Sequence, residues 1–342
     1  MAEGSHHMLR HTPIFVLVAL VLAAFAAACN SGGKSTVAVA ARPSAGCSQA
    51  APAAGVTEQT LTVGTEAGTY REMVPSAAAA MEPLPLIIDL HGLGTTAAER
   101  AAGSEFETLG EQQNAFVLTP NGLGPASAPG NNSLEFLTEF LDASEQRLCI
   151  DTARVFMGGM SLGGIIASTV GCQLEDRIAA IGVASGISFP DECQLSRPLP
   201  IMVFFGKLDT VIQYYGGIGY NLINSDPAPP PPTAPPADTQ GSPPIETVVT
   251  QWAAADGCLA EPNATQVSPH VELRSFVRCA EGSAVEFYQR RATRVARCGS
   301  GDVQPGVSDR PRRGHPANAR ASSHTVAVGL LDAAPSRAVT QI

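Results

Sequence analysis

Short apolar runs alternate with segments of helical periodicity from about residue 60 onward. Leu84–Leu90, for example, is a mostly apolar run typical of a buried strand. Strands that alternate with helices predict a mostly parallel central sheet flanked by helices, so the expected fold class is α/β. The expected strands are 84–90, 115–118, 155–157, 178–184, 199–205, 271–277 and 285–288, and the expected helices are 134–148, 162–170 and 245–255.

The N-terminal pattern predicts an export signal. Arg10 precedes an apolar run over residues 14–28, which is shorter than the roughly 20 residues of a membrane span and typical of a secretory signal. The run ends in small residues before Cys29, so we expect a signal peptide over 1–28, a lipid on Cys29 and a flexible tether over 29–57. The alternative is an ordinary secreted protein that is cleaved at the same place. The predicted location is extracellular, or membrane-anchored as a bacterial lipoprotein.

Composition and charge exclude two classes of protein. Hydrophobic residues make up 44% of the 342 residues, which is enough for a sizeable core and excludes wholesale disorder. The formal net charge of −10 argues against nucleic acid as a partner over most of the chain. The charge is distributed unevenly along the chain. Residues 288–342 contain nine Arg and three acidic residues, and the remainder of the chain is strongly acidic.

The cysteine count points to disulfides rather than metal. Export permits disulfides, and six of the eight Cys remain when Cys29 and Cys298 are set aside. Six cysteines allow 15 connectivities, and the sequence does not fix which one forms. Pairing between sequence neighbours favours Cys172–Cys193 and Cys258–Cys279, which leaves Cys47–Cys149. No cysteine has metal-site spacing, so we expect neither a metal nor a cofactor.

A proline-rich stretch interrupts the alternating pattern at 225–244. Such a run forms extended polyproline II and cannot join a sheet. It could separate two domains or bind an SH3-like partner. We favour a stiff surface insertion within one domain over 58–289, because the motifs before and after it belong to one set.

The strongest chemical motif is the Gly-x-Ser-x-Gly at residues 159–163. An apolar strand leads into it and a helical run leads out, so the glycines allow a strained strand-to-helix turn that exposes the hydroxyl of Ser161. The helix N-terminus adds a field that favours a developing anion. Ser161 is therefore the candidate nucleophile, against the alternative of a glycine-rich turn with an incidental serine.

Two further loops follow strands in the order that this chemistry needs. His91-Gly92-Leu93-Gly94 comes directly after 84–90, and in an α/β-hydrolase this loop supplies one amide of the oxyanion hole. We expect that amide to be Leu93 N–H, with Leu162 N–H as the second. Asp209 follows the strand 199–205 and is the candidate acid that orients a histidine, against the alternative of a turn-capping residue.

These motifs together resemble one family. LPLIIDLHG, RVFMGGMSLGG, PLPIMVFFGKLDTVIQYYGG and QWAAADGC are similar in spacing to the esterase/polyhydroxybutyrate-depolymerase family of α/β-hydrolases, over roughly residues 58–289. The resemblance implies an α/β-hydrolase fold, with Tyr214, Gly216 and Gly217 in the loop after Asp209. It also implies an ester substrate, either a polyhydroxybutyrate-type polyester or a feruloyl or acetyl ester of plant polysaccharide. One departure is Phe205-Gly206, where the family usually has His-Gly.

The larger departure concerns the catalytic histidine. The family places it shortly after a strand like 285–288, but here that strand runs into an arginine-rich tail over 290–342. His270 precedes the strand and is interpreted as a surface residue. In one hypothesis His315 is the base, displaced by an insertion of about 20 residues, with His324 as a further candidate.

The other hypothesis is a shift of reading frame near Gln289. Reading the codons of 290–297 one nucleotide later permits Gly-Gly-x-His-x-Trp-Pro-Gly, and the same shift over 328–335 permits a plausible final helix. The chain would then lack its proper histidine loop and last helix. The predicted function is a serine carboxylic-ester hydrolase, secreted or lipid-anchored. The alternative is a catalytically impaired binding lipoprotein that retains the fold.

Overall fold

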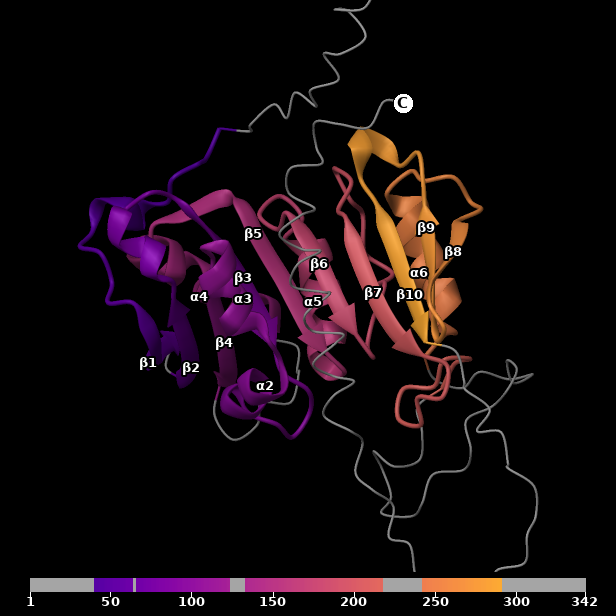
Figure 1. Cartoon of the computed structure of the whole chain (residues 1–342), viewed down its shortest axis with the longest axis horizontal. Helices are drawn as coiled ribbons and strands as arrows, with labels where there is room; N and C mark the ends of the chain where they lie inside the picture. Colours follow the sequence, from indigo (N-terminus) through magenta and orange to yellow (C-terminus); the bar gives the residue numbers. More distant parts are fainter. Residues whose placement is uncertain (1–39, 64–65, 124–132, 218–241, 291–342) are drawn as a thin grey trace, which may run out of the picture. The chain divides into compact units, whose positions relative to one another are not determined.

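A ten-stranded sheet organises the computed structural model, which describes residues 40–63, 66–123, 133–217 and 242–290. Figure 1 shows the strands in the order β1-β2-β4-β3-β5-β6-β7-β10-β9-β8. The strands from β4 to β10 in this order pair in parallel, and the outer strands on both sides are antiparallel. The bounds are β1 Gly55–Val63, β2 Glu66–Val74, β3 Leu84–Leu90, β4 Phe116–Leu123, β5 Ile150–Met160, β6 Ala180–Ala184, β7 Ile201–Gly206, β8 Asn263–Ser268, β9 Val271–Phe276 and β10 Val285–Arg290.

This topology confirms the predicted fold class. The chain passes from β3 to β4 and then returns across β3 to β5, which is the crossover of the α/β-hydrolase sheet. The strands expected from apolar runs all form, with bounds that differ by a few residues at most of their ends. The hairpin of β1 and β2 and the edge strand β8 were not predicted, because their sequences lack a continuous apolar run, although β2 buries Tyr70, Met73 and Val74.

Helices cover both faces of the sheet. Along β3, Leu86, Ile88 and Leu90 pack in one core cluster while Ile87 packs in another, as the alternation of a strand requires. The first cluster includes α4 (Ser133–Arg147), α5 (Leu162–Gln173) and α6 (Ile245–Ala255), and the second includes α3 (Phe106–Gln113). The short helix α2 (Ala97–Gly103) lies with α3 against β2 and β4.

The structure corrects the predicted tether over 29–57. Arg42 donates its amide to Asp151 Oδ1 at 2.9 Å, and Pro43 forms a bridge with the same residue. The Ser44 hydroxyl donates to the Leu148 carbonyl at 2.6 Å. Because these contacts and β1 use residues inside the expected tether, the hydrolase domain begins at about residue 42 rather than at 58.

Three disulfides join the pairs favoured by the sequence, Cys47–Cys149, Cys172–Cys193 and Cys258–Cys279. The first closes the longest loop, with a sequence separation of 102 residues, and fixes the segment before β1 to the start of β5. Closing a loop of this length removes conformational entropy from the unfolded chain and is typically worth several kcal/mol, on the order of 2–5.

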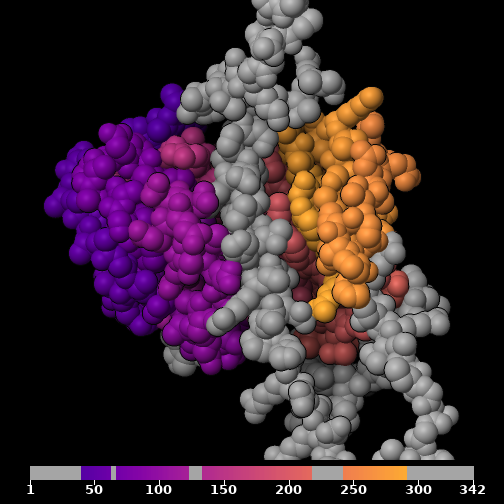
Figure 2. Space-filling model, in the orientation of Figure 1, coloured from indigo at the N-terminus to yellow at the C-terminus, as the bar shows by residue number. Residues whose placement is uncertain are grey.

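The proline-rich stretch lies mostly outside the described residues, and the described residues on either side of the gap 218–241 are hydrogen bonded to each other. Gly217 donates its amide to the Ser242 carbonyl at 2.8 Å. The elements before and after it, β7 and β10, pair in the same sheet, so the stretch is an insertion within one domain. The β8–β9 hairpin, orange in Figure 2, forms the sheet edge beyond β10. Within the described part of the chain, no helix is long and apolar enough to cross a membrane.

A buried acid fastens α6 to the sheet. Asp256 is fully buried and accepts hydrogen bonds from the Leu199 amide at 2.8 Å and from the Ser283 hydroxyl at 2.5 Å. Burial raises the pKa of this carboxyl to about 6, although the two donors oppose the shift. The folded state therefore binds a proton here more tightly than the unfolded chain does.

This predicts a pH-dependent loss of stability. The contribution of protonated Asp256 to the free energy of unfolding is fully present below about pH 4. It is lost as the pH rises through about 6, which lowers the free energy of unfolding by on the order of 2–3 kcal/mol. Asp256→Asn keeps an acceptor oxygen without the charge, so we expect it to remove this part of the pH dependence. Urea unfolding at pH 4, 5, 6 and 7 measures it, with exposed Asp191→Asn as the control. If the free energy of unfolding changed with pH in the same way in wild type and in Asp256→Asn, the raised pKa of Asp256 would not be the cause.

Candidate active site

Ser161 occupies a strained turn between β5 and α5. Its φ of 56° and ψ of −122° lie in a region that non-glycine residues rarely adopt. A Cβ at Gly159 would overlap the backbone of Gly163, and a Cβ at Gly163 would overlap the carbonyl of Leu90. The glycines on both sides of Ser161 are therefore required by close backbone packing. The Ser161 side chain makes no capping bond to α5.

The loop after β3 lies against this serine. A Cβ at Gly92 would be 3.5 Å from Ser161 Cβ and 4.0 Å from its Oγ. The Gly92 carbonyl accepts a hydrogen bond from the Thr95 hydroxyl at 2.8 Å and lies 2.8 Å from His91 Nδ1. This places Leu93, whose side chain is exposed, one residue beyond the contact with Ser161. His91 Nδ1 is engaged by the carbonyl of Gly92 within its own loop.

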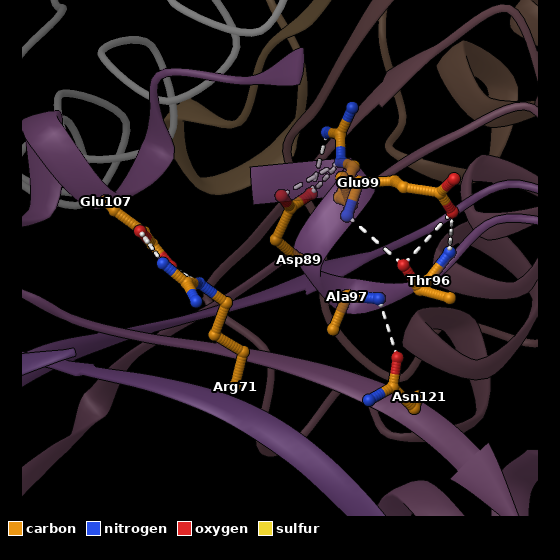
Figure 3. Close-up of polar contacts among 8 residues, drawn as sticks. Arg71, Asp89, Thr96, Ala97, Glu99, Glu107 and Asn121 are labelled. Atoms are coloured by element: carbon orange, nitrogen blue, oxygen red, sulfur yellow. Dashed lines mark hydrogen bonds and ion pairs between the residues drawn. The ribbon is translucent and has the colours of Figure 1, made fainter. Parts of the chain in front are cut away.

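Polar contacts hold this loop at both of its ends, and the one before it is buried (Figure 3). Before it, Asp89 forms a buried ion pair with Arg100 at 2.7 Å. After it, Thr96 and Glu99 form a capping box that starts α2. The Ala97 amide donates to Asn121 Oδ1 at 2.6 Å and joins the same helix start to β4. The loop that carries the Leu93 amide is thus fixed relative to the sheet.

Asp209 lies in the loop that follows β7. Its Oδ1 accepts hydrogen bonds from the amides of Val211 at 2.9 Å and Ile212 at 3.0 Å. Burial raises the pKa of this carboxyl, while the two amides that hydrogen bond to it oppose the shift. The carboxylate is thereby fixed in orientation at the same edge of the sheet as Ser161, as the triad arrangement needs.

A polar network anchors the acid loop to neighbouring elements. The Tyr214 hydroxyl donates to Glu246 Oε1 at 2.6 Å, and Gln289 Nε2 donates to the Tyr214 oxygen at 2.5 Å. Arg274 pairs with the same carboxylate at 3.2 Å, and Lys207 Nζ lies 5.1 Å from the centre of the Tyr214 ring. Burial and the Glu246 carboxylate raise the pKa of the Tyr214 hydroxyl far above its usual range, so it remains a donor.

The candidate base lies outside the described residues. Among the residues that the structure describes, no histidine hydrogen bonds to Ser161 or Asp209, and His315 and His324 fall beyond them. His270 is exposed in the turn between β8 and β9, as expected of a surface residue. The Lys207 amide donates to the Arg290 carbonyl at 3.1 Å, so the chain leaves β10 beside the loop that carries Asp209.

Sequence reasoning missed two residues at the end of β6. Ser185 has a φ of 50°, and its amide donates to the Phe204 carbonyl of β7 at 2.9 Å. A Cβ at Gly186 would overlap the backbone of Ser161, so this glycine permits β6 to end against the nucleophile turn. The Ser-Gly pair that follows an apolar strand is a turn signal that could have directed attention to this position.

The comparisons with known proteins point to esterases. The chain is 26% identical over 225 residues to feruloyl esterase B of Piromyces equi, covering 62% of this chain and 39% of that protein. It is 27% identical over 153 residues to a bifunctional acetylxylan esterase/xylanase of Neocallimastix patriciarum, covering 44% and 23% of the two chains. It is 24% identical over 185 residues to feruloyl esterase D of Neurospora crassa, covering 51% of this chain and 64% of that protein.

Each match spans less than two thirds of the relative. A solved acetyl xylan esterase from Aspergillus awamori superposes with a TM-score of 0.47 at 14% identity, covering 69% of this chain and 93% of that structure. No protein-family model matches the chain.

Proposed function

We propose that this chain, an α/β-hydrolase with feruloyl and acetylxylan esterases among its relatives, is a serine-dependent carboxylic ester hydrolase. The observation that carries the proposal is the strained Ser161 turn between β5 and α5, which has the Leu93 loop on one side and the end of β6 on the other. Asp209 at the end of β7 supports it, because the triad order of serine before acid is satisfied.

The mechanism that follows is acyl transfer in two steps. Ser161 Oγ attacks the ester carbonyl while a histidine takes its proton, and Asp209 orients that histidine and stabilises its cation. The amides of Leu93 and Leu162 stabilise the oxyanion, and the alcohol leaves with the proton that the histidine returns. Water then attacks the acyl-enzyme by the same route and releases the acid. None of these steps requires a cofactor or metal.

The proposed substrates are feruloyl or acetyl esters of plant polysaccharide. The names of the relatives support this class, and the resemblance to the polyhydroxybutyrate-depolymerase family adds polyesters as a second one. A second candidate function is a catalytically impaired protein that binds such an ester. The arginine-rich sequence after residue 289, where the family places its histidine, favours this alternative.

Ester hydrolysis tests the nucleophile. Wild type is expected to hydrolyse p-nitrophenyl butyrate and methyl ferulate and, after reaction with a fluorophosphonate, to carry a phosphonyl group on one serine, with fluoride as the leaving group. Ser161→Ala removes the attacking oxygen, so we expect at least a ~10³-fold loss of kcat and no labelling. Ser196→Ala, at an exposed serine that bonds only to Glu175 in the structure, is the control. Activity retained in Ser161→Ala would exclude this nucleophile, and an inert wild type that still binds the ester would support the impaired protein.

The base is tested separately. We expect His315→Ala to lower kcat by roughly 10³-fold or more, because removing one triad member leaves only the oxyanion hole and binding. His270→Ala changes an exposed histidine and is expected to leave kcat within about twofold. Full activity of His315→Ala would refute this base and direct the same test to His324.

Export and lipid attachment are also proposed. Three disulfides support an oxidising compartment outside the cytoplasm. We expect the mature chain to begin at Cys29 with a diacylglyceryl group on its sulfur, which would place the hydrolase at a membrane surface. Mass spectrometry of the N-terminal peptide measures this, and a peptide with a free Cys29 thiol would refute the anchor while leaving secretion open.

A further inference from the structure

The loop after β3 contains a β-turn over residues 92–95. Gly92 and Thr95 are its first and fourth residues, and the Thr95 amide donates to the Gly92 carbonyl at 3.3 Å. Gly94, the third residue of the turn, has a φ of 71°, a conformation that favours glycine. The main-chain bond is longer than the usual length of about 2.9–3.0 Å, so by itself it holds the Gly92 carbonyl only weakly.

Two side chains add shorter hydrogen bonds to the same carbonyl oxygen. The Thr95 hydroxyl donates to the Gly92 carbonyl at 2.8 Å, and His91 Nδ1 lies 2.8 Å from it. Because a carbonyl oxygen can only accept, the second contact requires a proton on Nδ1, so His91 is also a donor. One donor precedes Gly92 in the chain and the other follows it, and together they fix the direction of this C=O within the loop.

The direction of this C=O also sets the direction of the Leu93 N–H. Both groups belong to the peptide unit between Gly92 and Leu93, which is trans. In a planar trans peptide the C=O and the N–H point in opposite directions, so fixing one of them fixes the other. The same peptide unit begins at the residue that lies against the nucleophile, since a Cβ at Gly92 would be 3.5 Å from Ser161 Cβ.

We propose that Thr95 is a positioning residue, whose hydroxyl holds the peptide between Gly92 and Leu93 so that the Leu93 N–H points toward the oxyanion. The proposal rests on the proposed role of the Leu93 amide in ester hydrolysis. It assigns Thr95 no contact with the substrate, since the hydroxyl acts through the peptide. A hydrogen bond to the carbonyl also polarises the peptide and strengthens its N–H as a donor. The oxyanion forms only during the reaction, so Thr95 contributes to kcat rather than to binding of the ester.

Thr95→Val removes the hydroxyl but keeps the branched shape and the turn amide. Removing an oxyanion donor outright costs about 10²–10³-fold in kcat. Here the donor is misdirected rather than lost, so we expect kcat on p-nitrophenyl butyrate to fall roughly tenfold with KM within about twofold. Thr95→Ser retains the hydroxyl and is expected to recover kcat to within about twofold of wild type. Wild-type kcat in Thr95→Val, or no recovery in Thr95→Ser, would overturn the proposal.

The orientation of the Leu93 N–H can be measured without turnover. Residual dipolar couplings of the full chain report the direction of each N–H bond. Carbon-13 in the glycine carbonyls and nitrogen-15 in the leucine amides restrict the spectrum to the three Gly-Leu pairs of the sequence, and Leu93→Val identifies the signal of Leu93. We expect the Leu93 coupling to change in Thr95→Val and to return in Thr95→Ser. An unchanged coupling in Thr95→Val refutes the positioning role.

Thr138→Val is the matched control, because the Thr138 hydroxyl also donates to a main-chain carbonyl, that of Leu134 at 2.7 Å, but lies in α4. It should leave kcat within about twofold and the Leu93 coupling unchanged. If Thr95→Val does not fold, Thr95→Ala removes the same hydroxyl with the same expected results. The coupling also separates the two proposals, since an inert wild type whose Leu93 coupling changes in Thr95→Val supports the positioning role and rejects only the proposed hydrolysis.

Discussion

The close approach of three strand ends at Ser161 is the constraint on which the site depends. A Cβ at Gly163 would overlap the carbonyl of Leu90 at the end of β3, and a Cβ at Gly186, after β6, would overlap the backbone of Ser161. Side chains at these two positions would separate the strand ends and relax the turn. Their absence lets the backbone hold Ser161 at a φ of 56°, so main-chain packing rather than the serine itself maintains the exposed hydroxyl.

Two polar networks extend this rigidity to the loops on either side. The ion pair of Asp89 and Arg100 is buried, and removing one partner of such a pair would leave an uncompensated charge. On the other side, Tyr214 connects the loop of Asp209 to α6 and to β10 through Glu246 and Gln289. Both loops are therefore positioned by groups that do not take part in the proposed chemistry.

The local signals in the sequence predicted the parallel half of the sheet well. Each of these signals spans only a few residues, so it can be interpreted without knowledge of the fold. They are the apolar run before Ser161, the glycines around it and the strand before Asp209. The β1–β2 hairpin and β8 were not predicted because polar residues interrupt their sequences and leave no continuous apolar run, even in β2, where Tyr70, Met73 and Val74 are buried. The predicted tether was too long because the contacts that hold residues 42–48 are made with Asp151 and Cys149, which are far away in the sequence.

By itself the sequence determined the fold class, the favoured disulfide pairs and the candidate nucleophile, oxyanion loop and acid, because each depends on short-range pattern and chain order. The tertiary structure decided which residues lie next to them. Ser185 has no motif of its own, and its position between the Ser161 turn and β7 follows from the registers of β5, β6 and β7. Gly186 likewise reads as an ordinary turn glycine until the packing of strand ends shows that a side chain there would displace Ser161. Such contacts join residues far apart in the chain, so only the folded backbone specifies them.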